Sequence, residues 1–439
     1  MEGKPARVPG QPDKQAGEIR ARWAWVEPSV WTDRMLAALE NGVKGGKWFS
    51  LIDKVYSMAN LRAAWESVRS NRGAAGVDGQ SIELFEKNAE KHLQRLAEQL
   101  EADTYEPQPV RRSWIEKPGS SEKRPLGIPA VRDRVAQTAL RNVLEPIFEN
   151  GFAPRSYGFR PGRGCKDALR EVDRLLKDGS RWVLDADLKG YFDSIPHDQL
   201  TEAVQREVSD GRIIDLLEKY LTAGVMEGAE LWRTERGTPQ GAVISPLLAN
   251  LYLDPLDHMM AEAGYQMVRY ADDFVILCRS EAEARQARER VREFAEAHGL
   301  RLHPEKTRLV DATQKGGFDF LGYHFERGYR WPRPKSEKKL KDSIRSKTRR
   351  TDGRSLQAVI CDVNRTLRGW FGYFKHAHWT TFRPLDGWVR MRLRSILRKR
   401  RGGQGRGGGR DHHRWPNAHF ARLGLYSLEQ AHAEARQSL

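Results

Sequence analysis

The sequence contains little cysteine and no long apolar segment. Its three cysteines, Cys165, Cys278 and Cys361, lie far apart in 439 residues, and none belongs to a CxxC pair. This spacing argues against a disulfide framework and against a structural zinc site. Nowhere do about 18 apolar residues follow one another, so neither a membrane-spanning helix nor a membrane partner is expected. The N-terminus also lacks the apolar core of a secretory signal, and a reducing, cytoplasmic location is expected.

Negative charge is scarce relative to positive charge. Lysine and arginine number 75 against 59 aspartates and glutamates, which gives a formal net charge of +16. An excess of this size predicts a polyanionic partner, because Lys and Arg that contact phosphates release bound counterions. The alternative is a basic protein that its charge merely keeps in solution.

The apolar pattern indicates an α+β fold with an antiparallel sheet, because strands and helices alternate without regular βαβ units. Apolar residues at three- and four-residue steps predict helices between Thr32 and Gln99. The segment from Met1 to about Arg22 is polar and is predicted to be disordered. Two extended runs on either side of Pro118-Gly119-Ser120-Ser121 predict a hairpin.

Two acidic sites lie at the ends of predicted strands. Asp272 and Asp273 fall where two apolar runs meet, and Asp187 ends the apolar run that starts at Trp182. A lone pair of aspartates is most often an ordinary turn. A charge at the end of a buried strand needs a partner, however, and carboxylate oxygens bind hard divalent cations well. If the strands are neighbours, three carboxylates converge, as two-metal phosphoryl transfer requires.

Several motifs occur in an order that resembles the reverse transcriptases encoded by group II introns. The motifs are Asp187 followed by Tyr191-Phe192, residues 155–163 (RSYGFRPGR), residues 237–250 (GTPQGAVISPLLAN), the box Tyr270-Ala271-Asp272-Asp273, residues 304–307 (PEKT) and residues 320–323 (FLGY). The resemblance covers the chain from about Leu51 to its C-terminus. The chain has no paired cysteines of the kind on which the family's endonuclease is built, so the resemblance implies an endonuclease-lacking member similar to the bacterial class C lineage.

The resemblance implies an RNA-directed DNA polymerase of right-hand architecture, with fingers, a palm built on an antiparallel sheet, and an α-helical thumb. Such proteins also bind their intron RNA as maturases, assist splicing and support mobility by target-primed reverse transcription. The implied domains are an N-terminal, partly disordered extension (1–50), fingers (51–178), palm (179–327), thumb or maturase X domain (328–400), and a basic linker with a small DNA-binding-like tail (401–439).

The resemblance also assigns roles to individual residues. Two Mg²⁺ ions are expected on the catalytic carboxylates and one backbone carbonyl, namely Asp187, Asp272, Asp273 and Leu188. The residues expected to bind the nucleotide are Lys123, Arg124, Tyr191, Phe192, Gln240 and Gly241. Those expected to bind primer and template are Leu321, Gly322, Tyr323, Arg365 and Arg368. Phe192 resembles the ring that excludes a ribose 2′-hydroxyl, but Tyr191 is a rival for that role, and either ring is otherwise a core aromatic.

The implied partners are a group II intron RNA, an RNA template with a DNA primer, dNTPs and target DNA, in a bacterial cytoplasm close to the nucleoid. Two other interpretations stay open. One is an RNA-binding maturase without polymerase activity, and the other is a related polymerase recruited to host DNA repair or defence. Intact carboxylates at Asp187, Asp272 and Asp273 argue against the first, because a decayed polymerase has no need of them.

Overall fold

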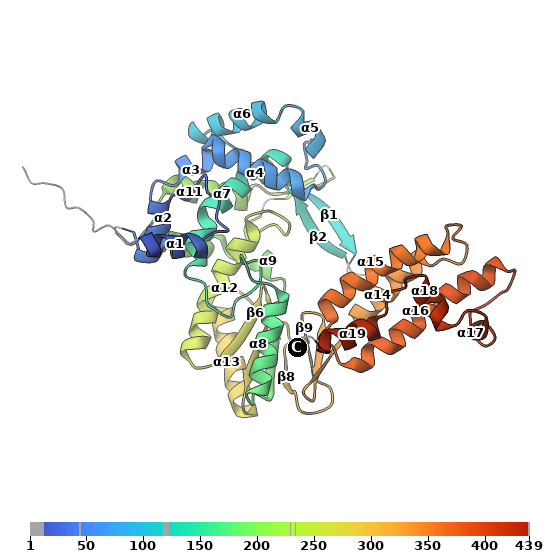
Figure 1. The fold of residues 1–439 in the computed structure, drawn as a ribbon. Helices are drawn as coiled ribbons and strands as arrows, with labels where there is room; N and C mark the ends of the chain where they lie inside the picture. Colours follow the sequence, from blue (N-terminus) through green and yellow to red (C-terminus); the bar gives the residue numbers. More distant parts are fainter. Residues whose placement is uncertain (1–12, 44, 117–122, 229, 233, 438–439) are drawn as a thin grey trace, which may run out of the picture.

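The computed structural model describes residues 13–43, 45–116, 123–228, 230–232 and 234–437. Figure 1 shows an open arrangement in which an N-terminal helical lobe and a central lobe with a sheet lie beside each other. A C-terminal helical lobe extends to one side of the central lobe. Mixed helices and mainly antiparallel sheets confirm the α+β class that the apolar pattern predicts.

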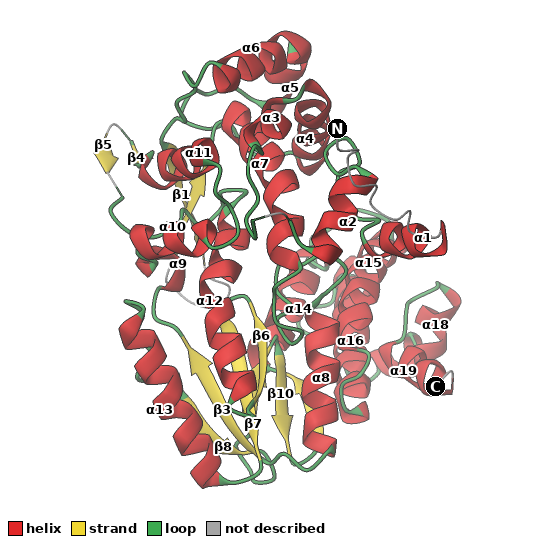
Figure 2. Ribbon diagram, turned by 90° about the vertical axis from the view of Figure 1, so that its left-hand side faces the viewer, coloured by secondary structure: helices red, strands yellow, loops and turns green. Residues whose placement is uncertain are grey.

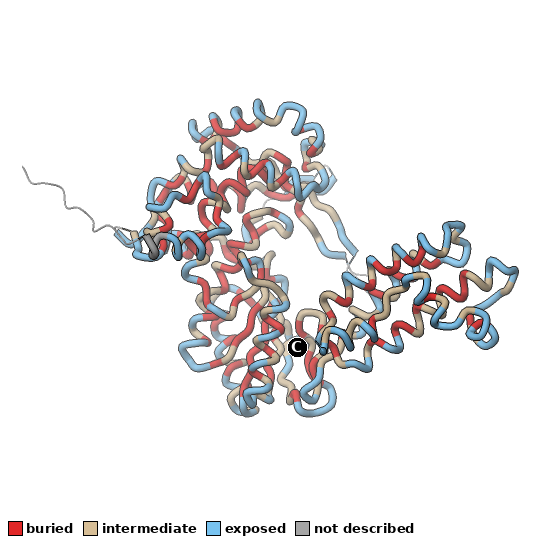
Figure 3. Tube along the Cα trace, viewed as in Figure 1, coloured by how far each residue is buried: buried red, intermediate tan, exposed pale blue. Residues whose placement is uncertain are grey.

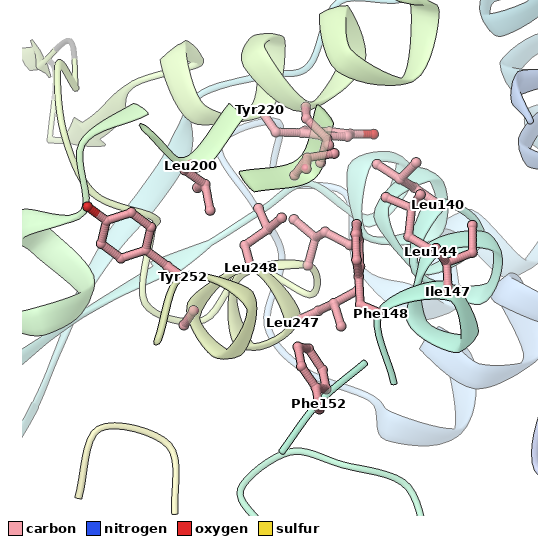
Figure 4. Packing of buried hydrophobic residues seen from close by; sticks show 14 of the residues in the cluster. Leu140, Leu144, Ile147, Phe148, Phe152, Leu200, Tyr220, Leu247, Leu248 and Tyr252 are labelled. Carbon is pink, nitrogen blue, oxygen red and sulfur yellow. The ribbon is translucent and has the colours of Figure 1, made fainter. Parts of the chain in front are cut away.

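The N-terminal lobe is built around one long helix, α7. The helices of this lobe are α1 (Asp13–Arg22), α2 (Asp33–Asn41), α3 (Ile52–Tyr56), α4 (Met58–Asn71), α5 (Ile82–Glu86), α6 (Ala89–Glu101) and α7 (Val131–Glu149). Helix α7 is buried on most of its surface, and Figure 3 shows this burial along the centre of the lobe. Leu140, Leu144 and Phe148 of α7 pack against Leu247 and Leu248 of the central lobe (Figure 4).

The prediction of disorder up to Arg22 is wrong for residues 13–22, which form helix α1. Arg20 pairs with Asp33, and Arg22 pairs with Glu40, so two ion pairs attach this short helix to α2. Ile19 also packs against the core. A helix of this length needs such tertiary contacts, and a polar composition does not reveal them. The first twelve residues lie outside the described part of the chain.

The predicted hairpin is confirmed and belongs to a small sheet. Its strands are β1 (Val110–Glu116) and β2 (Lys123–Ile128), and the sheet order is β2-β1-β4-β5 with β4 (Val225–Glu227) and β5 (Glu230–Trp232). The turn at residues 118–121 lies outside the described residues. Strands β4 and β5 have three residues each, too few to produce an alternation in the sequence.

The central sheet places apolar side chains on both faces. Its order is β6-β7-β3-β8, all antiparallel, with β3 (Trp182–Asp187), β6 (Gln266–Tyr270), β7 (Asp273–Cys278) and β8 (Arg308–Asp311). Val183 and Val275 pack with helix α8 (Cys165–Lys177), whereas Leu184 and Ile276 pack with α12 (Ser245–Glu262) and α13 (Glu281–Ala297). Figure 2 shows α8 and α13 on opposite sides of these strands. The two-residue period of a strand explains this division.

Three shorter helices follow β3, and the segment before β8 is a turn. The helices are α9 (Tyr191–Ser194), α10 (His197–Gln205) and α11 (Gly211–Thr222). Between Leu300 and Val310, regular strand pairing begins only at Arg308, in β8. Residues 304–306 form a turn instead, and Pro304 at its start cannot donate a ladder hydrogen bond.

The C-terminal lobe begins with a second small sheet. Its order is β11-β10-β9, from β9 (Phe318–Phe320), β10 (Tyr323–Glu326) and β11 (Tyr329–Pro332). The following helices are α14 (Pro334–Lys347), α15 (Leu356–Phe374), the 3-10 turn η1 (Trp379–Thr381), α16 (Phe382–Arg400), α17 (Asp411–Arg414), α18 (Asn417–Arg422) and α19 (Leu428–Gln437). The implied boundary between residues 327 and 328 falls in the turn between the paired strands β10 and β11. In the described residues, no helix has the length and apolar character needed to cross a membrane.

A buried guanidinium connects the sheet to helix α12. Arg269 on β6 is 0% exposed, and its Nε donates to the two carboxylate oxygens of Asp257 at 3.0 and 2.8 Å. Its Nη1 donates to Asn250 Oδ1 and to the carbonyl of Ala271, both at 3.0 Å. The carbonyl of Ala271 lies in the turn between β6 and β7. A single side chain therefore joins that turn to α12.

We predict that Asp257→Leu lowers the free energy of unfolding by about 3–5 kcal/mol, because it leaves the Arg269 charge buried without its partner. The double variant Arg269→Met/Asp257→Leu should recover most of this loss, since a well-packed apolar pair avoids the desolvation of both charges. Urea unfolding followed by circular dichroism measures both effects.

The matched control is Glu281→Gln, which breaks the exposed pair of Glu281 with Arg285 on α13. Exposed pairs of this kind contribute about 0.5 kcal/mol or less. If Asp257→Leu cost no more than this control, the buried pair would not be a determinant of stability.

Candidate functional site

The three predicted carboxylates meet at one end of the central sheet. Asp187, the last residue of β3, stands opposite Asp273, the first residue of β7, in the antiparallel register. Asp272 precedes it in the turn between β6 and β7, where Ala271 has a φ of 59°. Asp187 and Asp272, which are 85 positions apart in the chain, thus lie at the same end of two paired strands, as the sequence predicts if the strands are neighbours.

The electrostatics of this cluster favour a bound cation. Desolvation by the surrounding protein, and then the charges of Asp185 and Asp272, raise the pKa of Asp273 to about 7. Part of the residue is still exposed to solvent. Burial, and then the charge of Asp187, also raises the pKa of Asp272. Like charges held this close are costly when all are ionised, and a divalent cation removes that cost.

Three basic side chains approach the carboxylates from different elements. Arg124 on β2 counteracts the rise in the pKa of Asp272, and Arg333, just before α14, does the same for Asp273. Lys306 Nζ lies 3.3 Å from Asp187 Oδ2. Lys306 belongs to the motif at residues 304–307, but the sequence alone does not place it in the site. Membership of this motif was the only sign in the sequence that Lys306 belongs to the site, because its contact with Asp187 joins residues that are far apart in the chain.

The donor set fits Mg²⁺ if phosphates complete the coordination. Within the described ranges, no three His, Cys, Asp or Glu side chains are close enough to enclose an ion by themselves. Mg²⁺ usually binds one or two carboxylates and takes its other ligands from waters and substrate phosphates. Asp187, Asp272 and Asp273 are oxygen donors of this kind. Leu188 is buried beside them and forms an isolated bridge with Leu302.

The structure separates the two aromatic rings that follow Asp187. Tyr191 is 2% exposed, and its hydroxyl donates a 2.5 Å hydrogen bond to the carbonyl of Ala249. Phe192 is only partly buried and packs at the edge of the same core. The two ring centroids are 5.5 Å apart. Tyr191 is therefore a core residue, and Phe192 is the ring that a bound molecule can reach.

Gln240 and Gly241 contact the hairpin. The carbonyl of Gln240 accepts a hydrogen bond from Gly127 N at 2.6 Å. Gly241 has a φ of 108°, and a Cβ there would lie 2.6 Å from the carbonyl oxygen of Gly127. Glycine is thus required for the approach of this loop to β2, in addition to any role near a nucleotide. Lys123 is exposed at the start of β2, next to Arg124.

A layer beneath the Asp272 turn was missed by the sequence analysis. A Cβ on Gly158 would lie 2.2 Å from the backbone nitrogen of Ala271, so only glycine allows this contact. Asn250 donates to the carbonyl of Gly158 at 2.6 Å and accepts from Arg269. These residues position the turn without facing a substrate. The sequence signal for these residues is Arg269, a charged residue within the apolar strand before Asp272, because a buried arginine needs partners.

The residues predicted to bind primer and template lie at the start of the C-terminal lobe. Leu321 and Gly322 form the turn between β9 and β10, and the Leu321 carbonyl accepts from the hydroxyl of Tyr373 at 2.7 Å. Tyr323 is buried, and its hydroxyl donates to the Tyr373 carbonyl. This segment thereby holds helix α15.

Arg365 and Arg368 are exposed on α15, further from the strand turn. Arg365 pairs with Asp362, and the guanidinium of Arg368 lies 5.3 Å from the centroid of the Tyr426 ring. Both cations remain open to solvent, so phosphates can reach them.

Comparison with known proteins identifies two domain families in this chain. Residues 115–325 match the family described as reverse transcriptase (RNA-dependent DNA polymerase). Residues 337–415 match the group II intron maturase-specific domain. The first match contains every predicted catalytic and nucleotide-binding residue, and the second contains helix α15.

Individual relatives give the same result. YkfC of Escherichia coli K12 is 33% identical over 348 residues, which cover 70% of this chain and 86% of YkfC. The group II intron-encoded protein LtrA of Lactococcus lactis subsp. cremoris is 39% identical over 201 residues, 45% of this chain and 33% of LtrA. The mitochondrial nuclear intron maturase 2 of Arabidopsis thaliana is 28% identical over 231 residues, 44% of this chain and 31% of that protein.

The chain therefore spans most of YkfC but only about a third of LtrA. Both domain matches occur in the predicted order, and the matched reverse transcriptase region contains the carboxylate cluster. The chain belongs to the group II intron reverse transcriptases and maturases, and its enzymatic class is RNA-directed DNA polymerase.

Proposed function

We propose that Asp187, Asp272 and Asp273, with the carbonyl of Leu188, hold two Mg²⁺ ions for nucleotide transfer. The observation that carries this proposal is the register that sets Asp187 opposite Asp273, with Asp272 in the adjoining turn. When bound, the ions would activate the primer 3′-hydroxyl and neutralise the charge of the leaving pyrophosphate. Reverse transcriptases as a family depend on metal ions, in agreement with this role.

The surrounding side chains bind and orient the nucleotide. Arg124 and Lys123 on β2 neutralise the triphosphate, since the charge of Arg124 already opposes the rise in the pKa of Asp272. Gln240 and Gly241 line the pocket from the opposite loop. Phe192 lies under the sugar and excludes a ribose 2′-hydroxyl, whereas Tyr191 supports it from the core.

The C-terminal lobe binds nucleic acid. Between Tyr329 and Arg350 there are ten Lys or Arg against two acids. Arg365 and Arg368 add exposed cations on α15. These positions suit phosphate contacts, which set position and register rather than sequence. Leu321, Gly322 and Tyr323 would hold the primer end, and an intron RNA would contact the thumb helices.

We further infer that the protein assists splicing of its own intron RNA and copies it from a primer at target DNA, near the bacterial nucleoid. LtrA is itself named as a group II intron-encoded protein, and the similarity supports the same biological setting here. The basic segment from Arg401 to Arg410 contains no acid and is suited to contact target DNA.

We predict that Asp272→Asn abolishes DNA synthesis on an RNA template while the protein stays folded. Removing one anionic ligand takes away several kcal/mol of transition-state stabilisation, so the rate should fall by a factor on the order of 10³. Extension of oligo(dT) on poly(rA) with dTTP and Mg²⁺ measures this loss.

The control for that variant is Asp215→Asn, which removes an exposed charge on α11 without touching the sheet end. It should extend the primer like the wild type. Full activity in Asp272→Asn would refute the metal assignment. No extension by well-folded wild type would instead favour a maturase without polymerase activity.

We predict that Phe192→Val weakens discrimination against ribonucleotides by about tenfold to a hundredfold, because the smaller side chain leaves room for the 2′-hydroxyl. The ratio of kcat/KM for dTTP and UTP measures the change. Tyr191→Phe, which removes only the bond to Ala249, should keep the discrimination and lose about 1 kcal/mol of stability. If the two variants exchanged these phenotypes, Tyr191 would be the gate.

A further inference from the structure

A cavity lies in the C-terminal lobe and is lined by residues other than those proposed for polymerisation. Its volume is about 760 Å³, within the usual range for ligand-binding pockets. It is formed by β11, the loop between α15 and η1, and helix α19. None of its described lining residues is acidic, and none belongs to the set assigned above to the nucleotide, primer or metal ions.

Aromatic rings form one wall of this cavity. Tyr329 is 57% exposed and Trp379 is 59% exposed, which is unusual for rings of this size. His378 lies between them, with its ring centroid 4.9 Å from that of Tyr329 and 5.5 Å from that of Trp379. The three rings present flat faces and edges at the surface.

The backbone holds these rings in place. His378 N donates to the carbonyl of Arg330 at 2.7 Å, and Arg330 Nε donates to the carbonyl of His376 at 2.9 Å. Arg330 also pairs with Asp173 on α8. The loop therefore extends the edge of β11 as a rigid element, so the rings are ordered before any ligand binds. Pre-organisation of this kind reduces the entropic cost of binding.

Two cations beside the rings add positive charge to the cavity. Lys375 and Arg436 form no ion pair with any residue that the structure describes. Burial, and then the charges of Arg330 and Lys375, lowers the pKa of His376. Burial, and then the charge of Arg436, lowers the pKa of His432. The same neighbouring cations that contribute to these two shifts would attract an anion.

A purely structural role explains only part of this arrangement. Trp331 packs on His378 and bonds to Thr380, which suffices to hold the loop on the sheet. Tyr329 and Trp379 instead keep more than half of their surface in water. Exposed rings next to unpaired cations match the chemistry of an unpaired nucleic-acid strand, whose bases stack and whose phosphates need positive charge.

We propose that this cavity binds an unpaired stretch of RNA, with bases stacked on Tyr329 and Trp379 and phosphates near Lys375 and Arg436. RNA is favoured over DNA because Lys375 to Trp379 lie within the region that matches the maturase-specific domain of group II introns. The proposal deepens the nucleic-acid binding proposed above for the C-terminal lobe and rests on it for the choice of RNA. It is independent of the polymerase site, since it involves other residues and needs no catalysis.

The test uses the full chain with its cleft saturated by an unlabelled template–primer. A fluorescent, unstructured RNA of about 12 nucleotides is then titrated, and binding is followed by anisotropy. Tyr329→Ala/Trp379→Ala should weaken the affinity by a factor of about 5 to 150 for each base stacked, whereas Trp379→Phe should retain it. Primer extension should be unchanged, which separates this outcome from failure of the proposed polymerase site.

The charge contribution is tested with Lys375→Gln/Arg436→Gln. Loss of two phosphate contacts should reduce the slope of log affinity against log salt by roughly one to one and a half. The matched control, Phe49→Ala/Lys91→Gln, removes a ring that is 65% exposed and an exposed lysine in the N-terminal lobe, and should change neither quantity.

Cross-linking locates the bound strand directly. RNA carrying 5-iodouridine should cross-link to Tyr329, His378 or Trp379, as read by mass spectrometry of the peptides. Wild-type affinity in Tyr329→Ala/Trp379→Ala, or cross-links confined to other surfaces, would overturn the proposal. Tighter binding of a DNA strand of the same sequence would overturn the choice of RNA.

Discussion

The buried guanidinium of Arg269 is the interaction on which the catalytic geometry depends. It spans β6, helix α12 and the carbonyl of Ala271, one residue before Asp272. An arginine without water is stable only when a carboxylate and further acceptors satisfy it, and Asp257 and Asn250 do so. The position of the turn is therefore set by charge pairing in the core, and not by the preferences of the turn residues alone.

That turn then carries an opposing electrostatic constraint. Asp187, Asp272 and Asp273 are held close together by the sheet register, although their charges repel. Strands β3 and β7 lie in the middle of the central sheet, and their apolar side chains are buried. The free energy of this burial offsets the repulsion between the carboxylates. Cations bound as proposed would relieve this repulsion, so the same arrangement would serve both the metal ions and the substrate phosphates.

Individual hydrogen bonds fix the elements around this centre, in addition to the apolar cores that the lobes share. Gly127 and Gln240 connect the hairpin to the loop beside the site, and Tyr323 and Tyr373 connect the small sheet to α15. The hairpin is buried or half-buried where it meets this loop and becomes exposed only towards Glu116 and Lys123 (Figure 3).

The sequence by itself determined the fold class, the order of the motifs and the three carboxylates, because strand ends and adjacent aspartates are local patterns. It left Tyr191 and Phe192 undecided, and only the tertiary structure separated them, since burial depends on Ala249, which is distant in the chain. Lys306, Gly158 and Arg269 entered the site for the same reason. Local spacing cannot report a contact between residues on different elements, and the aromatic wall at Tyr329 and Trp379 likewise exists only after β11 and the loop before η1 meet.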